Sequence, residues 1–278
     1  MGMRINTNIA SLEAQKNLKV SSNEQQAEFS KLSSGKRITK ASDDAAGLAI
    51  ASSLKAQNLG LKQASRSAND GVSMVQVAEG GLNETTNILT RLRELSIQAS
   101  SDTVGDTERG FLQKEYTELT HEVDRIANSS KFNGKHLLNG DSEAGIMQIQ
   151  VGAFAGEENK ISFNASESDA TSNGLGINSI EITSRESASE SLTNIDDAIS
   201  KVSGYRSTLG AMQSRLQSAI NTLDVQYVNQ ESARSRIEDV DVAESAAKLA
   251  SSTIKQAAGT SVLAQANGIG NSALRLIS

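Results

Sequence analysis

The chain has 278 residues and a formal net charge of −6, from 27 Lys and Arg against 33 Asp and Glu. It contains no cysteine, which excludes disulfides, thiolate metal sites and a cysteine nucleophile. It also contains no proline and only 3% aromatic residues, which favours long unbroken helices with narrow apolar seams over a thick globular core.

The N-terminal region predicts a weak helix and no leader sequence. Glu13, Lys16 and Lys19 interrupt the place where a Sec-type signal peptide would need an apolar core. No stretch of the chain reaches the ~18 apolar residues of a membrane span, and its interspersed charges argue against nucleic acid as a partner. The helical stripe over residues 10–34 includes polar members: Ala14, Leu18, Ser21, Gln25, Phe29 and Leu32.

Alternating steps of four and three residues predict a long helix over residues 50–99. Eleven of the fifteen positions on the series that starts at Ile50 are apolar. Gly71, Gly80 and Gly81 weaken this helix by about 1 kcal/mol each relative to Ala. A shorter helix follows, with this stripe: Leu112, Tyr116, Leu119, Val123 and Ile126.

Residues 131–184 differ in composition from the helical segments and are rich in Asn, Gly and Ser. Apolar and polar residues alternate at 147–151, 161–163 and 180–182, which predicts three short strands. The glycines within 173–176 predict a turn. We therefore expect a small β-region here.

The C-terminal third predicts another long helix and a second arm. Eleven of fifteen positions are again apolar on the series from Ala188 to Ile237. Arg234 and Arg236 are expected to form salt bridges with Glu238 and Asp239, where this helix meets the arm. The arm itself has a mainly alanine stripe, which buries little area and is not stable alone: Ala243, Ala247, Ala250, Ile254, Ala258, Val262, Ala266, Ile269, Ala273 and Leu276.

These patterns predict a mainly α fold: a long-helix, coiled-coil-like bundle with a small β-region capping one end, and N- and C-terminal helical arms paired together. The expected domains are residues 1–43 with 236–278 as the arms, 44–140 with 185–235 as the bundle, and 141–184 as the β-region, with no large outer domain. Arms that order only on docking suit regulated polymerisation, since contacts with neighbouring copies offset the ordering entropy.

Short sequence motifs, here called words, lie near both ends of the chain. At the N-terminus they are Ile5-Asn6-Thr7-Asn8, Leu32-Ser33-Ser34-Gly35 and Asp43-Asp44-Ala45-Ala46-Gly47; at the C-terminus, Ser235-Arg236-Ile237-Glu238-Asp239 and Ala264-Gln265-Ala266-Asn267. In this order they resemble bacterial flagellin. The resemblance covers both ends and most of the long helices, whereas residues 141–184 carry no such words.

The resemblance implies a structural subunit that polymerises into the bacterial flagellar filament used for swimming motility. In flagellins the two termini form the inner core of a hollow helical filament and the bundle forms the next shell. Export runs through the flagellar type III apparatus, without a cleaved signal, to the extracellular filament. The implied partners are further copies, an export chaperone, and the filament cap and hook-associated proteins. No enzyme activity, cofactor or metal is implied.

Two sets of arm residues are the expected contacts. The polymerisation and chaperone arm comprises Leu249, Ile254, Val262, Leu263, Ile269, Leu274 and Leu276. The N-terminal arm comprises Ile5, Leu12, Leu18, Phe29 and Leu32. A chaperone would take the C-terminal helix in a groove.

Residues 91–95 and 112–115 resemble the flagellin segments that a vertebrate innate immune receptor recognises. The resemblance assigns receptor contacts to Arg91, Leu95 and Glu115. The alternative is that these residues are subunit contacts in the filament. Both can hold, because the receptor would meet the monomer.

Two local patterns look like chemical sites but are interpreted otherwise. His121-Glu122 opens like a zinc-protease helix, but Arg125 stands where the second histidine belongs. Asp43-Asp44 could be paired carboxylates, but Ser42 or Asp43 is expected to cap the following helix.

Two other functions stay open at this point. A hook–filament junction protein is a flagellin-like relative that occurs in few copies. A secreted adhesin-like binding module would present the β-region, for which only 44 residues, 141–184, are available.

Overall fold

The computed structural model describes residues 7–140 and 146–275, with side chains as far as Gly268. The chain divides into two compact units. We call Met1–Ala56 with Asn229–Ser278 the arm unit and Gln57–Val228 the bundle unit. The helices α2 (Ala45–Ala99) and α5 (Arg185–Glu238) each contribute residues to both. The three-part division expected from the sequence stays a prediction.

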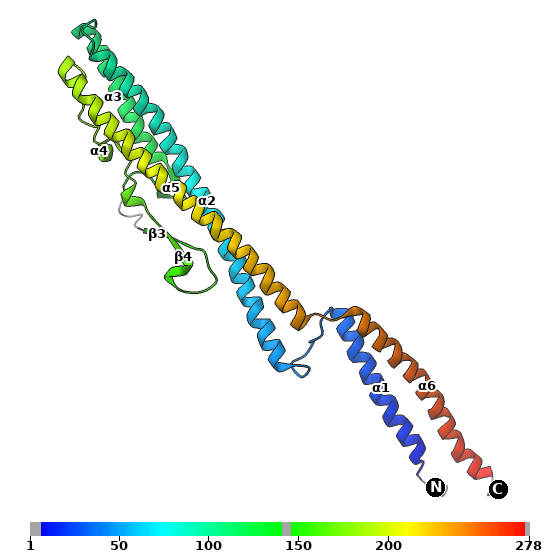
Figure 1. The fold of residues 1–278 in the computed structure, drawn as a ribbon. Coiled ribbons are helices and arrows are strands. Elements are labelled where there is room, and N and C mark those ends of the chain that lie inside the picture. The colour runs from blue at the N-terminus through cyan, green and yellow to red at the C-terminus, as the bar shows by residue number, and fades with distance from the viewer. Residues whose placement is uncertain (1–6, 141–145, 276–278) are drawn as a thin grey trace. The chain divides into compact units, whose positions relative to one another are not determined.

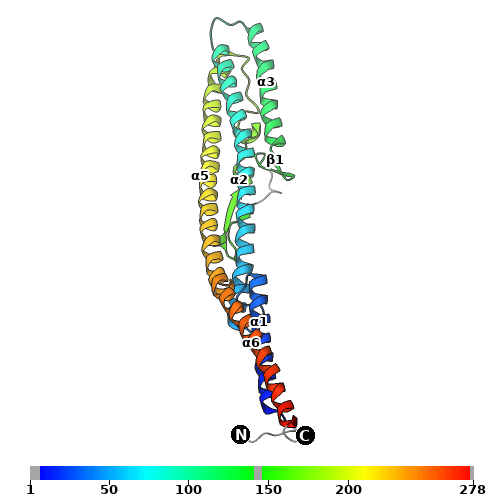
Figure 2. The same cartoon turned by 90° about the vertical axis from the view of Figure 1, so that its right-hand side faces the viewer.

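The bundle unit is built on three long helices that lie side by side: α2, α3 (Asp106–Ser129) and α5 (Figures 1 and 2). Every member of the predicted α2 series from Leu61 to Ala99 is buried. On α5 the series members from Ala188 to Leu223 are buried or half-buried. The heptad spacing therefore correctly identifies the faces that pack in this unit.

A buried arginine joins α2 to α3. The guanidinium of Arg109 donates to the carbonyl oxygens of Ala99 (2.9 Å) and Ser101 (3.0 Å) and to the Asp106 carboxylate (2.8 Å). Carbonyls at a helix C-terminus lack intrahelical partners. Arg109 thus satisfies the end of α2 from the first turn of α3.

Two small hairpins lie against the bundle. β1 (Lys131–Phe132) pairs with β2 (Lys135–His136), through a turn in which Asn133 and Gly134 both have positive φ. β3 (Ile146–Gln150) pairs with β4 (Lys160–Asn164) in antiparallel register, with Ile149 opposite Ile161. Two short 3₁₀ helices flank β4: η1 (Glu157–Asn159) and η2 (Ala165–Glu167). The strands predicted at 147–151 and 161–163 are confirmed.

The strand and the turn predicted further on are wrong. Residues 180–182 form no strand, because Ile182 packs into the core and its N–H donates to the Gln113 side chain (2.7 Å) instead of to a neighbouring strand. The turn predicted at 173–176 lies mostly within a single helical turn, α4 (Ser172–Leu175). Gly176 ends it with φ 81°.

The arm unit contains the antiparallel helix pair α1 (Ile9–Ser34) and α6 (Val242–Arg275). The side chain of Asn8 donates to the carbonyl oxygen of Ala266 (2.9 Å) and the Ser21 hydroxyl to that of Ser252 (3.3 Å). The buried or half-buried residues of α6 repeat every three or four positions: Ser245, Leu249, Ser252, Gln256, Gly259, Leu263 and Ala266. The remaining described residues of α6 are exposed.

On α6 this seam differs from the predicted one, and on α1 it departs from the prediction at Phe29. The stripe members Ala243, Ala247, Ala250, Ile254, Ala258 and Val262 are exposed, and of the described members only Ala266 is buried. On α1 the buried or half-buried seam is Ser11, Ala14, Leu18, Ser21, Gln25, Glu28 and Leu32. Phe29, predicted on this stripe, is 64% exposed. The other five members of the α1 stripe lie on the seam as predicted, whereas the most apolar face of α6 points away from α1.

The cap of α2 is neither Ser42 nor Asp43, the two residues expected from the sequence. The cap is Asp44, whose carboxylate accepts from the N–H of Gly47 (2.8 Å). Asp43 instead accepts from the N–H groups of Thr39 and Lys40 and from the Thr39 hydroxyl, which closes the preceding turn. Hydrogen bonds from Thr39 lower the pKa of Asp43.

Candidate interaction surfaces

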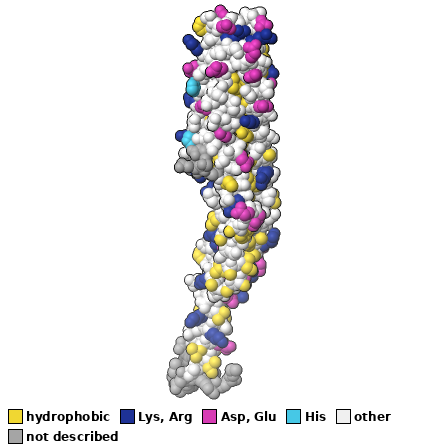
Figure 3. Space-filling view, turned by 90° about the vertical axis from the view of Figure 1, so that its left-hand side faces the viewer, with side chains coloured by type: hydrophobic (Ala, Val, Ile, Leu, Met, Phe, Trp, Pro, Cys, Tyr) yellow, Lys and Arg dark blue, Asp and Glu magenta, His cyan; other side chains and the backbone are white. Residues whose placement is uncertain are grey.

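The arm helices leave large apolar side chains uncovered. Leu12 and Phe29 on α1, and Ile254 and Val262 on α6, are all more than half exposed, with Ile254 at 69%. In Figure 3 hydrophobic side chains gather just below the middle of the view, and a few more are visible near its lower end. Apolar surface that repeats along both helices marks an interaction site more often than isolated exposed residues do.

The predicted arm contacts divide into two groups. Leu18 and Leu32 on α1 and Leu249 and Leu263 on α6 are half-buried and belong to the seam. The other described members are the four exposed residues above. Ile5 and Leu276 lie outside the described residues, as do the side chains of Ile269 and Leu274 in α6.

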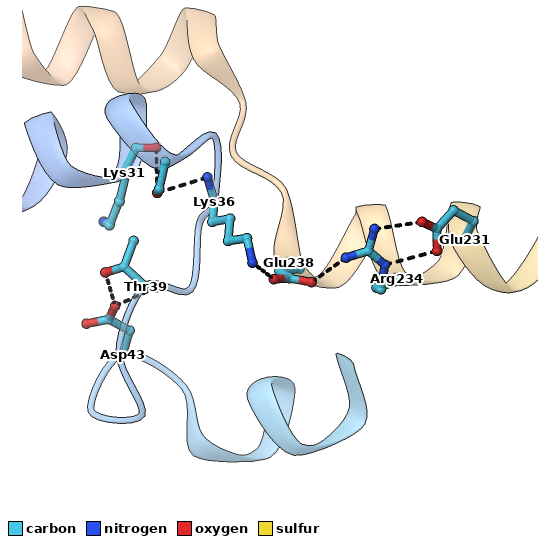
Figure 4. A network of polar contacts seen from close by, with 8 residues as sticks. Lys31, Lys36, Thr39, Asp43, Glu231, Arg234 and Glu238 are labelled. Carbon is cyan, nitrogen blue, oxygen red and sulfur yellow. Dashed lines mark hydrogen bonds and ion pairs between the residues drawn. The ribbon is translucent and has the colours of Figure 1, made fainter. Parts of the chain in front are cut away.

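A charged clasp joins the end of α1 to the end of α5 (Figure 4). The Glu238 carboxylate accepts an ion pair from Lys36 on one oxygen and from Arg234 (2.9 Å) on the other. Arg234 also binds both oxygens of Glu231, at 2.7 and 3.0 Å. The hydrogen bond from Lys36, together with Arg234, holds the pKa of Glu238 below its usual range although burial opposes this.

The backbone closes the same clasp. The N–H of Arg37 donates to the carbonyl oxygen of Glu238 (2.7 Å), and the N–H of Val240 donates to that of Gly35 (3.1 Å). Lys36 and Asp239 form an antiparallel β-bridge. The predicted bridge between Arg234 and Glu238 is confirmed, whereas Arg236 donates to the Ser232 hydroxyl.

Sequence reasoning assigned no contact to Lys36 or Arg37. Their signal is indirect: a positive pair directly follows a glycine that ends one helix, and an acidic pair ends another. Only the fold brings these segments together.

The three expected receptor residues do not share one surface. Arg91 on α2 pairs with Glu115 on α3 (2.8 Å) and with Glu94 (2.9 Å). The side chains of Arg91, Glu94 and Glu115 are partly exposed. Leu95 is 1% exposed and packs inside the bundle core. In this conformation a partner could reach Arg91 and Glu115 but not Leu95.

The side chains of α3 near His121 and Glu122 are not arranged as in a zinc-protease helix. Arg125 forms a salt bridge with Glu122 (2.6 Å), and this hydrogen bond lowers the pKa of Glu122. Within residues 7–140 and 146–275, no group of three or more His, Cys, Asp or Glu side chains is placed to hold a metal. No helix among the described residues is long and apolar enough to cross a bilayer.

Comparison with known proteins matches nearly the whole chain. The model of the bacterial flagellin N-terminal helical region matches residues 5–143, and that of the C-terminal helical region matches residues 192–277. A flagellin of Halalkalibacterium halodurans is 39% identical and covers 99% of this chain and 100% of its own length. A flagellar filament core protein of Brachyspira hyodysenteriae is 37% identical over the same shares.

Two solved structures are also similar. A Bacillus cereus flagellin is 28% identical with a TM-score of 0.50, covering 57% of this chain and 88% of that one. A putative flagellar hook-associated protein from Vibrio parahaemolyticus has a TM-score of 0.57 and covers 71% of this chain and all of that one. At 12% identity the second comparison supports the helical fold alone.

Proposed function

The chain belongs to the bacterial flagellin family, and on that premise we propose that the exposed apolar faces of α1 and α6 drive its assembly. It is a structural subunit of the flagellar filament. Relatives named as filament proteins align over their full length, which favours this function over a hook–filament junction protein or an adhesin.

The observation that carries the proposal is the direction of the apolar faces. Ten of the fourteen seam residues of α1 and α6 are small or polar and the other four are leucines, while Ile254, Val262, Leu12 and Phe29 face outward. A monomer that is stable alone would place these groups inside. Burial of one Ile or Val side chain contributes roughly 1.5–3 kcal/mol. Contact with neighbouring copies would bury these side chains and so stabilise the filament.

Polymerisation of purified chain tests this. The double variant Ile254→Ser with Val262→Ser should raise the critical concentration for filament growth by about 100-fold or more. The matched control is Lys255→Ser with Gln265→Ser, two exposed polar positions on the same helix, which should polymerise normally. Sedimentation and electron microscopy after seeding measure both. Equal critical concentrations for the two double variants would refute the proposal.

The same face of α6 suits an export chaperone. An exposed apolar stripe on a helix is what a hydrophobic groove binds, and occupation of Ile254 and Val262 would block assembly before export. Export without a cleaved signal, contact with cap and hook-associated proteins, and the lack of catalytic activity are part of this proposal. Competition between chaperone and filament seeds for labelled monomer tests the shared face.

An innate immune receptor is a further proposed partner, through the Arg91–Glu115 pair. The pair joins two helices across an exposed surface, so a receptor could read both charges at once. Reporter cells given monomer measure the response, with Arg91→Ala and Glu115→Ala expected to weaken it. The exposed pair Arg125–Glu122 on the same bundle supplies control substitutions. No response to unaltered monomer at high dose would reject this partner.

A further inference from the structure

The seam between α1 and α6 specifies its own register only weakly. Its residues are mostly small or polar, and they repeat with the same three- and four-residue spacing on both helices. A slip by one heptad moves one helix by about 10.5 Å along the other. Such a slip again places seam residues opposite seam residues: Ser21, now against Ser252, would lie against Ser245 or Gly259.

The polar contacts along the seam give limited discrimination. Ser21 binds a backbone carbonyl of Ser252, and an equivalent carbonyl exists at every turn of α6. Gln25 donates to the Thr253 hydroxyl (3.2 Å) at an exposed site, where water competes. Near the open end, Ser11 donates to the Asn267 side chain (2.8 Å). The polar contacts of the seam therefore do not fix the register by themselves.

At the other end of the seam, the segments that connect the clasp to α1 and α6 are too short to allow a slip. Only Gly35 separates the last residue of α1 from Lys36, and only Val240 and Asp241 separate Asp239 from the first residue of α6. Gly35 itself accepts from the N–H of Val240 (3.1 Å). A residue spans at most about 3.3–3.6 Å. A one-heptad slip therefore requires the Lys36–Asp239 bridge to open.

We propose that Glu238 is the positioning residue of the arm pair: its ion pair with Lys36 holds the clasp shut and thereby fixes the register of α1 on α6, while Arg234, one turn earlier on α5, orients the Glu238 carboxylate. Both carboxylate oxygens are used, by cations that come from different segments, and the residue is only 6% exposed. The other charged groups around the clasp are Arg37, which donates to the carbonyl oxygen of Ile237, and Glu231 and Asp239.

Neutralising Glu238 should therefore loosen register before it abolishes folding. The substitution Glu238→Gln puts a neutral amide in place of the carboxylate and leaves the ammonium of Lys36 without its counter-charge. The Lys36 side chain is 45% exposed, so without its counter-charge the ammonium gains more from water than from the closed clasp. The bundle unit contains none of these residues, so its core should be unaffected.

The absence of native cysteine allows register to be read directly by disulfide formation. One pair of substitutions, Ser21→Cys with Ser252→Cys, reports the native register. Two others, Ser21→Cys with Ser245→Cys and Ser21→Cys with Gly259→Cys, report slips of one heptad in either direction. A disulfide requires Cβ atoms about 3.5–4.5 Å apart, so the reporters do not overlap. Filaments are assembled reduced from mixed ¹⁴N and ¹⁵N subunits and then oxidised, and mass spectrometry counts only links within one chain.

With Glu238 present, the native link should dominate. Glu238→Gln should lower the ratio of native to slipped links by about tenfold, and Lys36→Gln, which removes the same ion pair between the two segments, should lower it to a similar extent. Glu244→Gln, which breaks an exposed pair with Lys248, is the matched control and should leave the ratio unchanged. If Glu238→Gln does not assemble, Lys36→Gln carries the test.

The inference rests on the proposed pairing of the arms in the filament, but the two fail differently. If the parent cysteine variants do not assemble at all, the proposed function is in doubt. If they assemble and the ratio is the same in Glu238→Gln, Lys36→Gln and Glu244→Gln, the clasp does not set register and the inference is overturned.

Discussion

Tyr116 illustrates at the scale of one residue how the bundle handles a polar group in its core. Its side chain is 1% exposed, and its hydroxyl has no hydrogen-bond partner among the described residues. Burial alone raises its pKa to about 12. The ring therefore packs as an apolar group does, and the hydroxyl contributes nothing favourable that the structure shows.

The raised pKa of Tyr116 predicts a specific loss of stability in alkali. Unfolded tyrosine ionises near pH 10 and the folded residue near pH 12, so stability is fully present below pH 10 and falls as pH rises to 12. The loss should reach roughly 2–3 kcal/mol at pH 12. Tyr116→Phe should match or exceed the wild type at neutral pH and lack this part of the decline. Urea denaturation from pH 9 to 12 measures it; identical declines would contradict the assignment.

At the scale of the helix, two adjacent glycines in α2 have opposite surroundings. A Cβ at Gly80 would meet no atom within 4 Å. A Cβ at Gly81 would lie 2.6 Å from the Ser130 hydroxyl oxygen and 2.8 Å from a methyl carbon of Leu138, both of which are buried. The sequence treats both glycines as equal weak points, whereas the structure assigns a packing role only to Gly81.

The pair yields a matched prediction. Gly80→Ala should stabilise the bundle by about 0.5–1 kcal/mol, because alanine restricts the unfolded chain and favours helix. Gly81→Ala gains the same propensity but must displace Ser130 and Leu138, and should destabilise the bundle by about 1–3 kcal/mol. Thermal unfolding followed by circular dichroism compares them. If both substitutions stabilise the bundle, Ser130 and Leu138 can move aside without loss of stability, and the packing role of Gly81 is contradicted.

The same scale shows what periodicity can and cannot predict. It identified α2 and α5 because the residues that are buried there are also the most apolar, from Leu61 to Ala99. On α6 it chose the exposed stripe, since periodicity locates an apolar face without saying whether the same chain covers it. The seam residues Ser245, Ser252 and Gly259 have no apolar signal at all.

The clasp was even less accessible to sequence reasoning. The bridge between Arg234 and Glu238 follows from their spacing of four residues on one helix. The bond from Lys36 to Glu238 joins residues about 200 positions apart and depends on how two helices end. Local rules predict the elements, and long-range contacts of this kind require the fold.

For the whole molecule, the two units differ in what stabilises them. The bundle unit has a large core, in which Leu82, Leu89, Leu92 and Ile195 are fully buried, and a second, smaller cluster that includes Leu61 and Leu223. The arm pair has a seam in which serine and glutamine occupy three of the seven positions on each helix. Since stability within a protein follows buried apolar contact, the units should open independently and the arms more readily.

Hydrogen exchange of the purified monomer tests this difference. Amides of α1 and α6 should exchange much faster than those of α2, α3 and α5 in the bundle unit, because opening the seam exposes little apolar surface. Leu82→Ala should cost the bundle about 2–5 kcal/mol and speed its slow amides, while those of α1 and α6 keep their rates. Equal protection of arms and bundle would mean that the seam is stable in one chain. The exposed faces of Ile254 and Val262 would then add a contact to arms already ordered, and assembly would not be what orders them.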